Sequence, residues 1–105
     1  MTWTGLASGD VGSALNAPNL PDKTVHVTGV YNTATVVIEG SNSATSATDF
    51  ITLTDPSDNA LSFASGTVDE HLEQIMQNPR RIRPSLGTAG GSASVTVYIV
   101  SRSSK

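Results

Sequence analysis

Apolar residues that recur at every second position constrain the fold of this 105-residue chain more than any other feature. In residues 23–31, KTVHVTGVY, Val25 and Val27 fall on one face, and threonines and a histidine fall on the other. Such alternation is typical of a β-strand that buries one face. The same pattern recurs in segments 34–40, 50–54, 60–65, 80–86 and 93–102. The sequence therefore predicts an antiparallel all-β fold.

Short polar segments separate these predicted strands. Asn32-Thr33 suits a hairpin, DPSDN at 55–59 is a turn in which Pro56 presets φ, and GTAGGS at 87–92 is a glycine-rich turn. Several short strands with regular turns favour a single-domain antiparallel β-sandwich of jelly-roll type. A small open barrel is the second choice.

Two segments depart from the strand pattern. Residues 68–77 place apolar side chains at helical spacing after a possible capping box, and Pro79 follows, so we predict one short helix there. Residues 1–22 contain three glycines and two prolines with few apolar residues. We therefore predict that 1–22 form an extended N-terminal arm that docks on a neighbouring subunit, and that 23–105 form the β-sandwich domain.

Composition excludes several classes of function. The chain has no cysteine, so disulfides and thiolate sites are ruled out. Its net charge of −3 argues against general nucleic-acid binding. No segment has the length of an apolar membrane span, and the first residues do not form a signal peptide. We expect a soluble protein, made in the cytoplasm, that binds neither nucleic acid nor membrane.

Residues capable of catalysis or metal binding are few and poorly grouped. The turn at 55–59 offers Asp55, Asp58 and Asn59, fewer ligands than calcium needs. His71 has no second histidine at helical spacing, and His26 has no nearby base or nucleophile in the sequence. We therefore predict that the protein is not an enzyme and holds no metal or cofactor.

A cluster of arginines is the charged feature with the clearest functional meaning. Arg80, Arg81 and Arg83 supply half of the six basic residues of an acidic chain. Arginine is enriched at protein interfaces because its planar guanidinium pairs with carboxylates. We predict that these arginines, together with Trp3 in the arm, bind a partner protein; protection of an edge strand by charge is the alternative reading.

Three stretches of the sequence resemble a known family. They are VHVTGVYNTATVVIEGSN at 25–42, FITLTDPSDNALSF at 50–63 and RRIRPSLGTAGGSASVTVYIV at 80–100. Together they resemble the small β-sandwich head-decoration (cement) proteins of tailed bacteriophages, over roughly residues 10–102. The resemblance implies a virion structural protein on the capsid surface, with the major capsid protein as partner and a trimer or dimer as the assembled form.

The GSN hairpin motif is also similar to that of discoidin-type carbohydrate-binding sandwiches. A carbohydrate-binding module, or a tail-associated adhesion protein, is therefore the alternative function. Aromatic side chains that could stack on a sugar are few, and Trp3, Tyr31 and Tyr98 are the candidates.

Overall fold

The computed structural model describes residues 1–17, 21–64, 70–87 and 93–103. These residues form strands and no helix, which confirms the all-β class. The strands are β1 (Thr2–Leu6), β2 (Leu15–Asn16), β3 (Asp22–Val30), β4 (Thr35–Ser41), β5 (Ile51–Thr52), β6 (Ser62–Ala64), β7 (His71–Ile75), β8 (Arg81–Leu86) and β9 (Ser94–Arg102). The described residues contain no helix long and apolar enough to cross a membrane.

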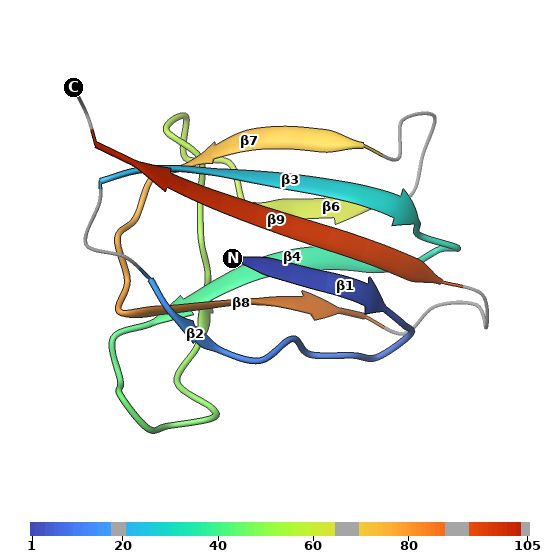
Figure 1. Ribbon diagram of the computed structural model, residues 1–105, viewed down its shortest axis with the longest axis horizontal. Helices are drawn as coiled ribbons and strands as arrows, with labels where there is room; N and C mark the ends of the chain where they lie inside the picture. Colours follow the sequence, from blue (N-terminus) through green and yellow to red (C-terminus); the bar gives the residue numbers. More distant parts are fainter. Residues whose placement is uncertain (18–20, 65–69, 88–92, 104–105) are drawn as a thin grey trace.

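The strands form two antiparallel sheets that face one another (Figure 1). The first sheet has the order β1-β9-β3-β7, and the second has the order β2-β8-β4-β5, with β6 also paired to β4. Figure 1 shows β1 and β9 side by side, although they come from opposite ends of the sequence. The arrangement is sandwich-like, as the strand count predicted.

The core lies between the sheets and is built from the inward positions that the alternation predicted. In the first sheet Val27 pairs with Val97, and both side chains are fully buried. In the second sheet Val36 and Ile38 of β4 are equally buried. The predicted hairpin between β3 and β4 is wrong, because the turn at Asn32-Thr33 carries the chain from one sheet to the other.

The predicted helix at 68–77 is also wrong, because residues 71–75 form strand β7. β7 pairs along β3 from Lys23–Ile75 to Val27–His71. Pairing covers the edge of β3 and buries Ile75, so tertiary contacts override the local helical spacing. His71 faces inward and stacks on Phe63, with ring centroids 4.9 Å apart. Of the capping box proposed for the helix start, Thr67 lies outside the described residues, as does Val68, whereas Glu70 is described and pairs with His26.

The predicted N-terminal arm is not observed either, because residues 2–6 pair with β9 as β1. Trp3 is only 6% exposed within the core, and its Nε1 donates a hydrogen bond to the carbonyl of Ser13 at 2.8 Å. Gly5 has a φ of 66°, in the irregular stretch of β1 between Trp3 and Leu6, which both face the core. The glycine that suggested an arm therefore permits a bulged strand.

Residues 7–17 complete the second sheet by running along β8. Gly12 donates its N–H to the carbonyl of Pro84 at 2.9 Å, and Leu15 pairs with Ile82. A Cβ on Gly12 would lie 2.7 Å from Trp3 and 2.8 Å from Pro84, so this crossing requires glycine. β8 consequently lies between two chain segments and is not an edge strand.

Candidate functional site

The structure places Arg81 and Arg83 on one side of β8, beneath the loop of residues 42–50. Arg81 donates from Nε to the carbonyl of Ser43 at 2.7 Å and from Nη2 to the carbonyl of Ser46 at 2.5 Å. Its planar guanidinium thus binds the loop backbone through two hydrogen bonds. This loop, which has no apolar pattern of its own, is held by side chains of the same chain.

Arg83 completes this arrangement with a carboxylate and an aromatic ring. Its Nε donates to Oε1 of Glu39 at 3.0 Å, and its Nη1 donates to the carbonyl of Ala47 at 3.2 Å. Its Cζ lies 3.8 Å from the ring centroid of Phe50, and that of Arg81 lies 5.1 Å away. We call Arg81, Arg83, Glu39 and Phe50 the arginine clamp.

The clamp changes the interpretation of the predicted partner-binding residues. Arg81 and Arg83 already have partners within the chain, and Trp3 is buried. Arg80 differs, because it is exposed and its hydrogen bonds to other described residues are made by its backbone. Its N–H donates to Oδ1 of Asn42, and its carbonyl accepts from the N–H of Ala17. Of the four predicted residues, Arg80 therefore offers the most surface to a partner.

Sequence reasoning missed Glu39 and Phe50 as members of this group. Glu39 lies directly opposite Arg83 because β4 and β8 pair in that register. Phe50 is brought beneath both guanidinium groups by the loop that follows β4. Glu39 and Phe50 flank the loop in sequence, but only the pairing of β4 with β8 brings the arginines to them.

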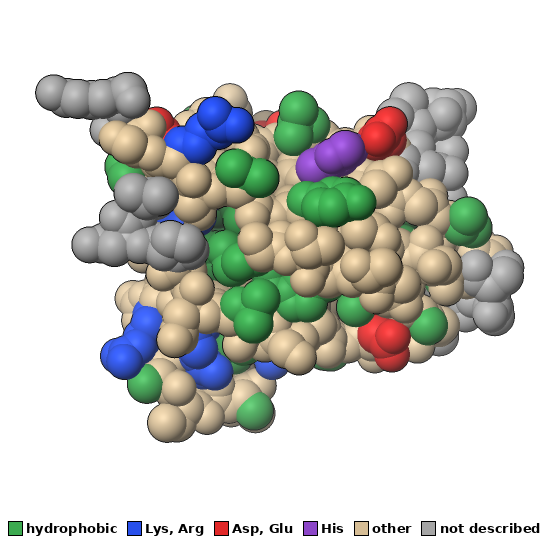
Figure 2. Space-filling model, in the orientation of Figure 1, with side chains coloured by type: hydrophobic (Ala, Val, Ile, Leu, Met, Phe, Trp, Pro, Cys, Tyr) green, Lys and Arg blue, Asp and Glu red, His purple; other side chains and the backbone are tan. Residues whose placement is uncertain are grey.

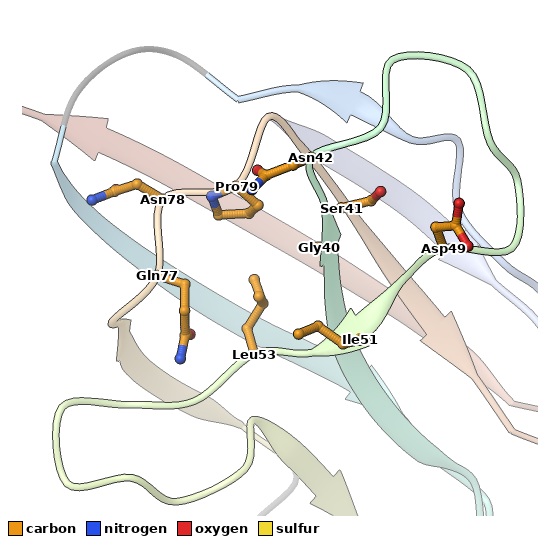
Figure 3. A pocket seen from close by; sticks show the side chains of 9 residues that line it. All are labelled: Gly40, Ser41, Asn42, Asp49, Ile51, Leu53, Gln77, Asn78 and Pro79. Carbon is orange, nitrogen blue, oxygen red and sulfur yellow. The ribbon is translucent and has the colours of Figure 1, made fainter.

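A hollow of about 280 Å³ lies beside the clamped loop (Figure 3). Its lining consists of Gly40, Ser41, Asn42, Asp49, Ile51, Leu53, Gln77, Asn78 and Pro79. A Cβ on Gly40 would lie 2.6 Å from Pro79 and 2.9 Å from Leu53, so glycine lets these side chains close over β4.

The two amide side chains of Gln77 and Asn78 in the lining of this hollow are bonded to other parts of the chain. Gln77 binds Thr54 through both ends of its amide, and Oδ1 of Asn78 is bonded to Nζ of Lys23. Figure 3 shows the side chains of Gln77 and Asn78 pointing away from the hollow. These two amides are therefore not aimed into the hollow at a common reacting atom, which is the arrangement that catalysis needs.

The outer face of the first sheet carries exposed apolar side chains. Leu72 on β7 and Tyr98 on β9 both pair with His26 on β3, and Val100 lies in the next row of β9. Leu72 is 69% exposed, Val100 47% and Tyr98 41%. We call Leu72, His26, Tyr98 and Val100 the outer strip. Figure 2 shows green side chains on both sides of a purple histidine on this face.

His26 links the two apolar ends of the outer strip. Its ring centroid lies 5.7 Å from that of Tyr98, and its Nε2 lies 2.9 Å from Oε2 of Glu70. The strands β3 and β9, which carry His26 and Tyr98, are both nine residues long and pair along their whole length. The outer strip is therefore supported by a continuous hydrogen-bonded pair of strands. A rigid surface with large exposed side chains is suited to binding without ordering a loop.

The pKa of the Asp55 carboxyl is lowered by hydrogen bonds within its own turn. Backbone N–H groups of Asn59 and Ser57 bond to Oδ1 of Asp55 and hold the pKa of this carboxyl below 3.8. The turn at 55–59 thus uses Asp55 to fix its own backbone. Among the described ranges, no three histidine, cysteine or acidic side chains group to hold a metal ion.

Comparisons of the chain with family models, with curated proteins and with solved structures gave no match. Its function is therefore inferred from its own residues and surfaces.

Proposed function

We propose that this chain is a decoration (cement) protein of a tailed bacteriophage, which binds the outer surface of the head and stabilises contacts between capsomers. The outer strip is the observation that carries the proposal, together with the resemblance of residues 25–42, 50–63 and 80–100 to that family. The partner is the major capsid protein, and the bound form is a trimer or dimer at the virion surface.

The outer strip has the composition expected of an interface centre. Aromatic and large apolar side chains dominate the energetic centres of protein interfaces, and charged groups lie around them. Tyr98, Leu72 and Val100 supply such a centre, His26 lies between Leu72 and Tyr98, and Glu70 is the charged group beside His26. The face of the sheet is better suited to docking than the free edge of β7, because exposed Glu73 on that strand discourages pairing with another strand.

Capsid binding by two sets of variants tests this proposal. Leu72→Ser and Val100→Ser each remove an exposed apolar side chain from the strip, and we expect each to weaken binding about tenfold, which corresponds to about 1.4 kcal/mol. Ile51→Ser is the matched control, because Ile51 is 71% exposed but lies on the second sheet. Equal occupancy of all three variants on capsids would contradict docking through the outer strip.

Arg80 provides a second test of the same proposal. Its exposed side chain is free to approach acidic groups of the capsid, so Arg80→Ala should slow association at low salt and have less effect at high salt. Arg102→Ala is the comparison for loss of an arginine on the docking face itself, since Arg102 lies exposed on β9 on the same face as Tyr98 and Val100. If the two variants bind with the same salt dependence as the unchanged protein, Arg80 does not contact the capsid.

A carbohydrate-binding module is the second candidate, and Tyr98 favours it. The ring of Tyr98 is partly exposed on a sheet face that also carries Thr2, Thr24 and Thr96, so a sugar could stack on the ring and bond to hydroxyls. Titration with soluble oligosaccharides, with Tyr98→Ser as the variant, distinguishes the candidates. Saturable binding that Tyr98→Ser abolishes would favour the glycan module over the decoration protein.

A further inference from the structure

Lys23 is buried, and no described residue forms an ion pair with it. It is 1% exposed and is the only charged side chain buried among the described residues. The ion pairs found in the same part of the chain join His26 to Glu70 and Arg83 to Glu39, and neither includes Lys23. An ammonium in such a position is costly unless it is paired or neutral, so its presence calls for an explanation.

The surroundings of Lys23 bring its amine to a carboxamide. The alternation of β3 turns Lys23 inward with Val25 and Val27, and its Nζ is bonded to Oδ1 of Asn78. Asn78 belongs to the segment between β7 and β8, and in Figure 3 its side chain points away from the hollow toward the start of β3. The amine of one sheet thus contacts the amide of the segment that enters the other.

The neighbouring strands bury Lys23, whereas Asn78 is exposed. Ile75 of β7 and Ser101 of β9 are the residues paired with Lys23 on either side. Ile75 is buried, and the buried Oγ of Ser101 has no hydrogen-bond partner within the described ranges. Burial lowers the pKa of the Lys23 ammonium below its ordinary value of 10.5, and the charge of Asp22 offsets only part of this effect. A larger fraction of the Lys23 amine is therefore neutral, and hence nucleophilic, than in an exposed lysine.

We propose that Lys23 and Asn78 join in an intramolecular isopeptide bond. The lone pair of the neutral Nζ attacks Cγ of Asn78, and a new bond forms between Nζ and Cγ. The bond from Cγ to Nδ2 breaks, one proton passes from Nζ to Nδ2, and ammonia leaves. No oxidant or reductant is needed. Ser101, which pairs with Lys23 on β9, has a buried hydroxyl without a hydrogen-bond partner in the described ranges and is the candidate to carry the proton.

The bond would explain the buried lysine and supply the fold with a covalent link. An amide carries no charge, so acylation removes the cost of burying the ammonium. The link would join residues 55 positions apart in a chain that has no cysteine for a disulfide. By closing a long loop it would restrict the unfolded chain, as a disulfide does. The inference is independent of the capsid proposal, because it concerns the protein alone.

Intact-mass spectrometry of the purified, denatured full-length chain tests the proposal. We expect a mass lower than that of the sequence by one molecule of ammonia, and a protease digest in which the peptides containing Lys23 and Asn78 remain joined. Lys23→Arg and Asn78→Ala should each restore the full mass, whether or not the variant folds. Asn42→Ala is the matched control, because it removes another asparagine of the hollow, and it should keep the deficit.

Two features of the chain make the result unambiguous. Asn78 precedes Pro79, which has no N–H, so the usual cyclisation of asparagine onto the next backbone nitrogen cannot cause the loss of ammonia there. Lys105 is the other lysine in the sequence and serves as an internal control for amine labelling. A full mass, with Lys23 labelled as completely as Lys105 in denaturant, would overturn the proposal.

Discussion

Replacing Arg83 with methionine tests whether the arginine clamp stabilises the fold. Methionine keeps most of the volume of the side chain and its contact with Phe50, but it removes the charge and both donated hydrogen bonds. Because the side chains of Arg83 and Glu39 are 18% and 21% exposed, their ion pair is shielded from solvent more than a typical surface pair.

The expected loss follows from the interactions of the guanidinium. A hydrogen bond to a charged group contributes about 1.5–3 kcal/mol, and a partly exposed cation–π contact contributes about 1 kcal/mol. The contributions of the hydrogen bonds and of the cation–π contact are not additive, because one side chain makes them all, and methionine keeps part of the packing. We therefore expect Arg83→Met to lower the free energy of unfolding by about 2–3 kcal/mol. For a domain of this size the change corresponds to a fall in Tm of about 10 °C.

Urea denaturation of the unchanged protein and a set of variants measures this effect. The unchanged protein, Arg83→Met and Arg80→Met are compared, because Arg80 has the same charge but an exposed side chain outside the clamp. Arg80→Met should change stability by less than about 0.5 kcal/mol. Glu39→Gln in combination with Arg83→Met closes a double-mutant cycle, whose coupling should be about 1 kcal/mol. Equal loss in Arg83→Met and Arg80→Met would refute the clamp.

Two further predictions concern the N-terminal strand and the turn at 55–59. Trp3→Ala should lower the free energy of unfolding by about 3–5 kcal/mol, because it empties a core site and leaves the carbonyl of Ser13 without its donor. A melting curve close to that of the unchanged protein would indicate that this segment is an arm and not part of the core. The pKa of Asp55 is lower in the folded than in the unfolded chain, so its stabilisation is complete above pH 3.8 and is lost as the pH falls through the folded pKa. Unfolding followed at a series of pH values below 3.8 should show a weaker pH dependence for Asp55→Asn than for the unchanged protein, and identical slopes would contradict this role.

The strands with a regular alternation were predictable because their pattern is local. β3, β4, β8 and β9 each place apolar residues at every second position, and the same residues are buried in the structure. β7 was misread because Leu72, Ile75 and Met76 also fit helical spacing over a short segment. The segment forms a strand because it pairs with β3, whose edge would otherwise be unpaired.

The site could be predicted only in part for the same reason. The sequence singled out Arg81 and Arg83 by their charge, but their partners come from the pairing of β4 with β8, which places Glu39 opposite Arg83. The outer strip likewise depends on the register that brings Leu72 and Tyr98 to either side of His26.

The N-terminal strand shows most clearly what tertiary structure decided. Glycines and sparse apolar residues made 1–22 resemble an arm, yet Met1 and Ile99 exchange backbone hydrogen bonds of 2.9 and 2.8 Å across 98 positions of sequence. Alternation within a strand is set by neighbouring residues, so the sequence alone determined the β class and the inward side chains. Which strands pair, and in which register, depends on contacts between residues far apart in the chain, which no local pattern records.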